Sequence, residues 1–112
     1  MATHSMNLQP RYFDFIKDGT KRIELRLFDE KRQKIALGDI IEFNKSETEK
    51  FEAKVIGLLR YDSFESLFKD FDVSILADAS MTKDELLGIL EEFYTPEKQK
   101  EYGVIGIRIE LL

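Results

Sequence analysis

The sequence predicts an α+β fold in which a small, curled and mostly antiparallel sheet, or partial β-barrel, is flanked by helices. Three observations support this prediction. Three segments with strand character follow one another in the first half of the chain, helical segments gather in the second half, and a last strand closes the chain. Such clustering is typical of α+β domains, whereas regular alternation of helix and strand would have indicated a parallel doubly wound sheet.

A helix followed by a strand forms the first predicted unit. Pro10 suits a first helical position because the N–H that proline lacks would have no partner there. Apolar residues follow at helical spacing, and Gly19 is expected to end the helix as a left-handed cap. Residues 22–27 then alternate strictly between charged and apolar side chains, which is the period of a half-buried strand. The apolar side chains of this strand are expected to face the core: Ile23, Leu25 and Leu27.

Two further strands are expected in the middle of the chain. Residues 29–35 form a polar connection that has room for one helical turn, and a Gly-Asp turn precedes a strand at residues 40–44. A charged hairpin loop leads into the longest strand, residues 51–61. Gly57 interrupts that strand and is expected to mark a β-bulge.

The second half begins with helices and ends with a strand. Ser63 is expected to cap a short amphipathic helix, whereas residues 72–79 fit neither helix nor strand clearly. A capping box starts a longer helix at Thr82, and a further helical turn starts at Pro96. Residues 102–112 close the chain as a strand.

Length and composition indicate a single domain. The chain has 112 residues, of which 43% are hydrophobic and 12% aromatic, enough for one core. Residues 1–5 carry no pattern and are interpreted as a flexible leader or cloning remnant, so the domain is expected to span residues 6–112. Neither an apolar run of membrane-spanning length nor a signal-peptide pattern is found, so a cytoplasmic location without membrane association is expected.

The residue types exclude several kinds of chemistry. The chain has no cysteine, so disulfides, a cysteine nucleophile and a cysteine-bearing zinc site are excluded. The single histidine, His4, lies near the N-terminus. Carboxylates alone can hold Mg²⁺, but no group of Asp and Glu has a spacing that indicates such a site. We therefore expect neither a metal nor a cofactor.

The charge of the chain is uneven. The net charge is −5, which argues against binding of nucleic acid through bulk electrostatics. Residues 1–40 carry eight Lys and Arg against six Asp and Glu, a balance of +2, and residues 41–112 carry nine against sixteen, a balance of −7. An anionic ligand would thus meet the first third of the chain, although random scatter could produce the same small difference.

The stretch DGTKRIELR, residues 18–26, concentrates charge between two apolar runs. On a strand, Glu24 and Arg26 share a face, so they can form an ion pair. Arginine presents a fork suited to a phosphate or a base edge, lysine a point charge, and glutamate an acceptor for an amino group. Lys21, Glu24 and Arg26 could therefore form a ligand cup. The alternative is an exposed strand face whose ion pair contributes about 0–1 kcal/mol.

The same stretch resembles the G-x-K-x-x-E-x-R signature of ASCH-domain proteins, relatives of the PUA RNA-binding domain. Gly19, Lys21, Glu24 and Arg26 fill the four motif positions. "LGDIIEFN" and "EYGVIGIRIEL" are similar to later elements of the family, and the resemblance covers residues 6–112. It implies a PUA-like β-barrel with flanking helices, a cleft lined by the motif residues, and RNA, a nucleotide or a nucleoside as the partner.

The resemblance leaves binding and catalysis open. One branch of the family hydrolyses N4-acetylcytidine, but it has a threonine where this chain has Glu24. The distant acid of that branch would fall near Ala79, where the nearest carboxylates are Asp78 and Asp84. A small hydrolase of an acylated nucleoside or of RNA is thus the second hypothesis, with Lys21 and Glu24 as the catalytic candidates and Glu24 as a general base. A binding module is preferred, and a partner-binding domain without a nucleotide ligand is a third hypothesis.

Aromatic residues are the remaining binding candidates. Tyr102 could stack on a base, as aromatic side chains do in single-strand recognition. The alternative for Tyr102 is a core position beside a glycine turn. Tyr12 and Phe13, on the helix that leads into the motif, are interpreted as core or rim residues.

Overall fold

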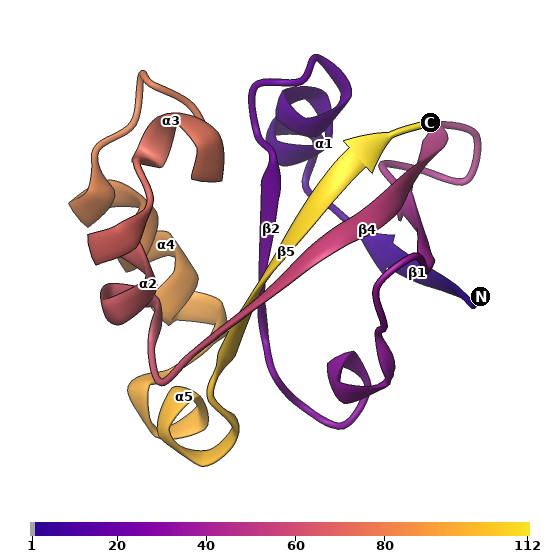
Figure 1. Cartoon of the computed structure of the whole chain (residues 1–112). Helices are drawn as coiled ribbons and strands as arrows, with labels where there is room; N and C mark the ends of the chain where they lie inside the picture. The colour runs from indigo at the N-terminus through magenta and orange to yellow at the C-terminus, as the bar shows by residue number, and fades with distance from the viewer. Residues whose placement is uncertain (1) are drawn as a thin grey trace.

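A five-stranded mixed sheet that curls into a half-barrel forms the centre of the structure, a computed structural model that describes residues 2–112 (Figure 1). In spatial order the strands are β1 (Thr3–Asn7), β3 (Ile40–Asn44), β4 (Lys50–Tyr61), β5 (Val104–Leu111) and β2 (Ile23–Leu27). All neighbouring strands are antiparallel except β1 and β3, which are parallel. The predicted α+β fold with a curled, mostly antiparallel sheet is confirmed.

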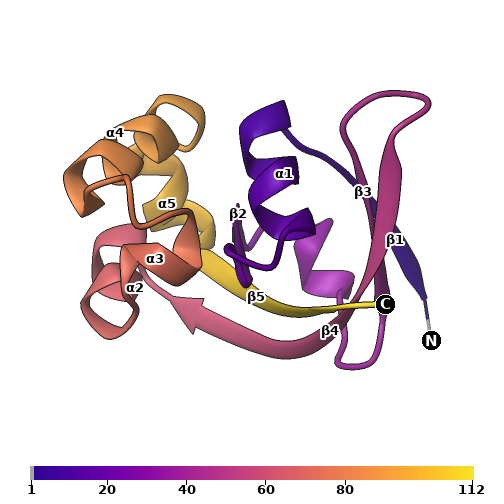
Figure 2. The ribbon, with the colours of Figure 1, turned by 90° about the horizontal axis from the view of Figure 1, so that it is seen from above.

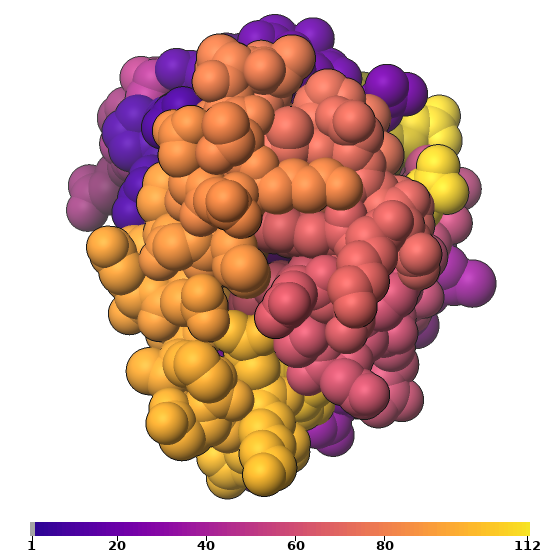
Figure 3. All heavy atoms as spheres, turned by 90° about the vertical axis from the view of Figure 1, so that its left-hand side faces the viewer, coloured from indigo at the N-terminus to yellow at the C-terminus, as the bar shows by residue number. Residues whose placement is uncertain are grey.

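The helices lie in two groups. They are α1 (Pro10–Lys17), α2 (Phe64–Asp70), α3 (Val73–Leu76), α4 (Lys83–Phe93) and α5 (Pro96–Tyr102), and a 3₁₀ turn spans Arg32–Lys34. Figure 2 shows α1 on the inner side of the curl, whereas α2 to α5 gather beyond β2. Seen from that side, α2 to α5 form a layer that covers most of the strands (Figure 3).

Two clusters of buried side chains form the core. The first packs α1, through Phe13 and Ile16, against the inner face of β3, β4 and β5. The second packs β2 against the helical layer and includes Ile23, Leu25 and Leu27, as the alternating pattern predicted. Helix α1 also contacts the second cluster, through the partly buried Tyr12 and Phe15.

Most local predictions are confirmed. Pro10 is the first residue of α1, and Gly19 follows the helix with a φ of 87°. The register between β4 and β5 shifts between Val55 and Gly57, which is the predicted bulge. The capping box at Thr82 is present, and the ambiguous segment 72–79 contains the short helix α3.

The expectation that residues 1–5 lie outside the fold was wrong for the described residues 2–5. Thr3, His4 and Ser5 belong to β1 and pair with Ile40 to Glu42 of β3. Among the five residues of β1 only Met6 is buried, so the strand has no apolar alternation that the sequence could reveal. Backbone pairing and a 2.8 Å bond from His4 Nε2 to Asp39 hold it at the sheet edge. Met1 lies outside the described residues. Within residues 2–112, no helix is both long and apolar enough to cross a bilayer.

Candidate functional site

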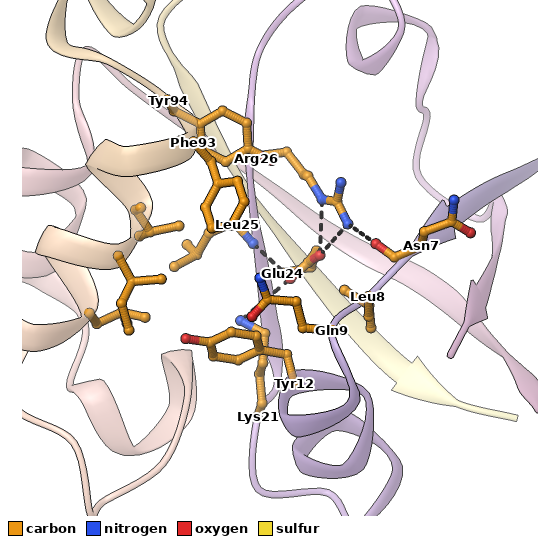
Figure 4. Close-up of a pocket in the computed structure, with 13 residues that line it drawn as sticks. Asn7, Leu8, Gln9, Tyr12, Lys21, Glu24, Leu25, Arg26, Phe93 and Tyr94 are labelled. Carbon is orange, nitrogen blue, oxygen red and sulfur yellow. Dashed lines mark hydrogen bonds and ion pairs between the residues drawn. The ribbon is translucent and has the colours of Figure 1, made fainter. Parts of the chain in front are cut away.

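A cavity of about 200 Å³ lies where the half-barrel stays open, between its two edge strands β1 and β2. The residues that line it come from the end of β1 and the start of α1, from the motif strand β2, and from α4 (Figure 4). They are Asn7, Leu8, Gln9, Tyr12, Lys21, Glu24, Leu25, Arg26, Leu86, Ile89, Leu90, Phe93 and Tyr94. Segments far apart in the sequence thus meet at the open seam of the sheet.

The turn after α1 places Lys21 inside the molecule. The left-handed backbone at Gly19 reverses the chain, and the N–H of Lys21 then donates to the carbonyl of Phe15 at 2.9 Å. The next residue, Arg22, donates its N–H to Ile75 of α3 at 2.8 Å. The chain is therefore fixed on both sides of Lys21, and this side chain is only 4% exposed.

Lys21 joins three parts of the structure. Its ammonium donates to the carbonyl of Ile23 at 2.7 Å and to the carbonyl of Leu76 at the end of α3. The same nitrogen lies 3.5 Å from the Glu24 carboxylate and 5.9 Å from the centre of the Tyr12 ring. In an ideal strand, side chains three positions apart point to opposite faces, which would separate Lys21 from Glu24. The structure brings them together because Lys21 precedes β2 and is not bound by its alternation.

Glu24 is the centre of the charged network. It is also 4% exposed, and its Oε1 accepts the N–H of Leu25 at 3.2 Å. Its Oε2 accepts from Arg26 Nε at 3.0 Å and lies 2.9 Å from Arg26 Nη2. Both carboxylate oxygens thus have partners within the protein, so the orientation of Glu24 is fixed without a ligand.

Arg26 bridges the open seam of the half-barrel. Besides its contacts with Glu24, its Nη2 donates to the carbonyl of Asn7, the last residue of β1, at 3.0 Å. No backbone ladder joins β1 to β2, since the two strands lie at opposite ends of the sheet order. A single guanidinium therefore connects the two edges beside the cavity.

Burial and ion pairing act in opposite directions on the three charged groups. Burial lowers the pKa of Lys21, and the Glu24 carboxylate offsets this only in part. Burial alone would raise the pKa of Glu24, but Arg26 and Lys21 outweigh it and hold that pKa below its ordinary value. Burial likewise opposes the charge of Arg26, yet its pKa is raised because Glu24 lies so close. The site thus keeps Glu24 ionised at neutral pH.

The predicted site residues separate into two groups. The cavity is lined by three of them, Lys21, Glu24 and Arg26. Gly19 forms the turn that precedes these residues. Tyr102 does not line the cavity: it ends α5 and packs against the second core cluster. The carboxylates of Asp78 and Asp84, weighed as the distant acid of a hydrolase, do not line the cavity either.

The apolar wall of the cavity was not predicted from the sequence, and Tyr12 was predicted only as a core or rim residue. That wall consists of residues of α4 and its end, chiefly Leu86, Ile89, Leu90, Phe93 and Tyr94. One signal could have revealed it, because α4 carries more apolar side chains than one core-facing stripe needs. Phe93 in particular stays 59% exposed, which is unusual for a side chain of this size.

Two observations bear on what the site can hold. Within residues 2–112, no group of three or more His, Asp and Glu is placed to hold a metal ion. The size of the cavity is informative, since an apolar cavity of about 150 Å³ accommodates benzene. A cavity of about 200 Å³ therefore has room for one flat ring, with the charged network on one side and the α4 residues on the other.

Comparisons with known proteins agree with the motif. The ASCH domain family model matches residues 6–112. The crystal structure of the hypothetical protein PH0355 has a TM-score of 0.89 and 38% sequence identity, with all of both chains covered. The solution structure of protein PF0455 from Pyrococcus furiosus has a TM-score of 0.80 and 33% identity over 98% of this chain and 97% of that one.

A more distant structure shows the same fold. The S128A mutant of ZmASCH from Zymomonas mobilis has a TM-score of 0.67 at 12% identity, over 96% of this chain and 67% of that chain. No curated protein matches the sequence. The family model spans nearly the whole chain and the predicted resemblance is confirmed, so this protein belongs to the ASCH domain family and has its PUA-like fold.

Proposed function

We propose that this protein is an RNA- or nucleotide-binding module that holds one nucleobase in the cavity between β1 and β2. The observation that carries the proposal is the ordered network of Lys21, Glu24 and Arg26 beside a cavity of ring size. Charged groups that are buried and already paired form a rigid wall, which is a favourable setting for recognising a ligand with little loss of entropy. Membership of a PUA-like family supports the same class of ligand.

Binding is favoured over catalysis by the state of the two catalytic candidates. The ammonium of Lys21 is engaged by two backbone carbonyls and by Glu24, so it has little freedom to move a proton to a substrate. The lowered pKa of Glu24 makes this carboxylate a weak base. Hydrolysis of an acylated nucleoside such as N4-acetylcytidine is therefore the second candidate.

The charge distribution sets the expected strength of binding. The whole chain carries −5, and among the described residues that line the cavity the cations are the buried Lys21 and Arg26, whose side chain is 13% exposed. We expect local contacts to one or two nucleotides and a weak dependence on salt, because few phosphates would be neutralised.

The test is titration of the folded protein with nucleosides, nucleoside monophosphates and short single-stranded RNAs by calorimetry. Arg26→Gln removes the guanidinium of the seam, and Arg22→Gln, an exposed neighbour outside the cavity, is its matched control. We expect binding by the unmodified protein, at least tenfold weaker binding by Arg26→Gln, and no change in Arg22→Gln.

Two results would contradict the proposal. One is the absence of binding to every probe by folded protein, and the other is equal affinity in Arg26→Gln. A parallel incubation with N4-acetylcytidine, followed by chromatography for cytidine, decides the second candidate. Turnover that Glu24→Gln abolishes, with its fold intact, would establish hydrolysis instead.

A further inference from the structure

The cavity has two aromatic walls that the motif does not explain. Tyr12 reaches it from α1 and Phe93 from the end of α4. Figure 4 shows the Phe93 ring near the Arg26 end of the charged network and the Tyr12 ring near its Lys21 end, with the Gln9 side chain between the two rings. Residues 12 and 93 come from the two separate helical groups, so only the folded chain brings these rings to the same cavity.

Phe93 is the less expected of the two. A phenylalanine contributes to stability chiefly by burial, yet this one remains 59% exposed. Its contact with Tyr94, at 6.5 Å between ring centres, covers only part of it. The exposed remainder borders the cavity, so an incoming ring would bury apolar surface that folding leaves in contact with water.

The charged groups of the cavity are compensated within the protein. Both oxygens of Glu24 accept hydrogen bonds, and Lys21 donates to two carbonyls. A charged ring would have to displace one of these contacts, at the cost of leaving a buried charge unpaired. An uncharged ring would displace none. The Gln9 amide has no hydrogen-bond partner within residues 2–112, so it can supply both a donor and an acceptor to the edge of such a ring.

We infer that Tyr12 and Phe93 form an aromatic clamp for one uncharged heteroaromatic ring of nucleobase type, whose edge is read by Gln9 while any phosphate stays outside. The inference rests on the proposed function and adds to it the residues that hold the base. Stacking on aromatic side chains is tolerant of ring identity, because every base has a π face. The clamp therefore selects for flat uncharged rings as a class.

The experiment compares cytidine, adenosine, their 5′-monophosphates and ribose 5-phosphate as separate probes. Nucleosides and nucleotides should bind with closely similar affinities, and ribose 5-phosphate should not bind. Proton NMR of the bound nucleosides should show upfield shifts of the base protons, which arise when a ring lies over an aromatic face.

Phe93 is the position for variants because its exposure makes substitution safe for folding. Phe93→Leu keeps apolar bulk without the ring and should weaken nucleoside binding by a factor of about 5 to 150, the range that loss of one stacking partner produces. It should also reduce the upfield shifts to the share that Tyr12 contributes, whereas Phe93→Trp should restore both. The matched control is Leu37→Ala, an exposed apolar residue that is 65% exposed and does not line the cavity.

The outcomes separate the clamp from the proposed function. Equal nucleoside binding in the unmodified protein and in Phe93→Leu overturns the clamp and leaves the proposed function standing. Binding of ribose 5-phosphate and nucleotides but not nucleosides also overturns the clamp, because recognition would then be directed at phosphate. Failure of the unmodified protein to bind any probe overturns both.

Discussion

On the edge of β2 that pairs with no other strand, Lys21 binds a backbone carbonyl and Glu24 binds a backbone N–H. Lys21 donates to the carbonyl of Ile23 at 2.7 Å, Glu24 accepts from the N–H of Leu25 at 3.2 Å, and the two side chains lie 3.5 Å apart. Unpaired groups on a sheet edge invite pairing with other chains, and burying them without partners costs free energy. The lysine and glutamate of the K-x-x-E spacing thus satisfy the backbone groups of an edge strand and also line the cavity.

Glu24→Gln should lower the free energy of unfolding by about 3 kcal/mol, because removal of one member of a buried ion pair leaves its partners uncompensated. Lys21 and Arg26 would both lose their anionic partner. Urea unfolding followed by circular dichroism measures the loss. Glu47→Gln, in the exposed hairpin loop, is the control and should change little. A loss below about 1 kcal/mol would mean that the network contributes no more than a surface pair.

Arg26→Lys should loosen the seam between β1 and β2. Lysine cannot hold Glu24 and the Asn7 carbonyl with one planar fork, so we expect faster amide hydrogen exchange in residues 6–8. Mass spectrometry of deuterium uptake measures this. Arg108→Lys, on an exposed position of β5, should leave exchange in residues 6–8 unchanged. Unaltered exchange in Arg26→Lys would show that parallel pairing with β3 alone secures β1.

Asp39 should make the contribution of β1 to stability dependent on pH. Hydrogen bonds from His4 and from the N–H groups of Ala2 and Ala36 lower its pKa from 3.8 to about 2. A carboxyl group whose pKa is lower in the folded state stabilises the fold above its unfolded pKa. That stabilisation is lost as pH falls through the folded pKa.

The measurement is the difference in urea midpoint between the unmodified protein and Asp39→Asn. This difference should be complete at pH 7 and should shrink as pH falls from 3.8 towards 2. Asp62→Asn, at an exposed position, corrects for changes in net charge. A difference that stays constant across this range would contradict the role assigned to the Asp39 carboxylate.

Gly106 and Gly88 should respond differently to alanine. At Gly106, on β5 opposite Leu25, a Cβ would lie 3.0 Å from the buried Ile23 side chain and 3.2 Å from that of Leu67. Overpacking of this kind costs about 1–3 kcal/mol. At Gly88, an exposed position of α4, no atom lies within 4 Å of an added Cβ, and alanine has the higher helix propensity.

Thermal unfolding of the two variants tests this contrast. Gly106→Ala should have the lower melting temperature, and Gly88→Ala should be at least as stable as the unmodified protein. Equal melting temperatures would show that Ile23 and Leu67 can move aside without cost.

The local elements and the motif turn were open to prediction from sequence. The alternation of residues 22–27, the capping box at Thr82 and the bulge at Gly57 each depend on residues adjacent in the chain. Strand β1 was not predictable in this way. Only one of its side chains is buried, and the strand is held mainly by backbone pairing to β3. Backbone pairing does not depend on an alternation of apolar residues, so the sequence pattern could not predict it.

The sequence by itself determined the class of fold, the helix–glycine–strand turn and the residue types that could meet a ligand. Only the tertiary structure decided that Lys21 is buried rather than exposed, because the carbonyl of Leu76 that accepts a hydrogen bond from its ammonium lies 55 positions away. It also brought Phe93 to the cavity and left Tyr102 in the core. Periodicity reports which face of one element is apolar, whereas a site is made by contacts between elements, and those are set when the whole sheet closes around its core.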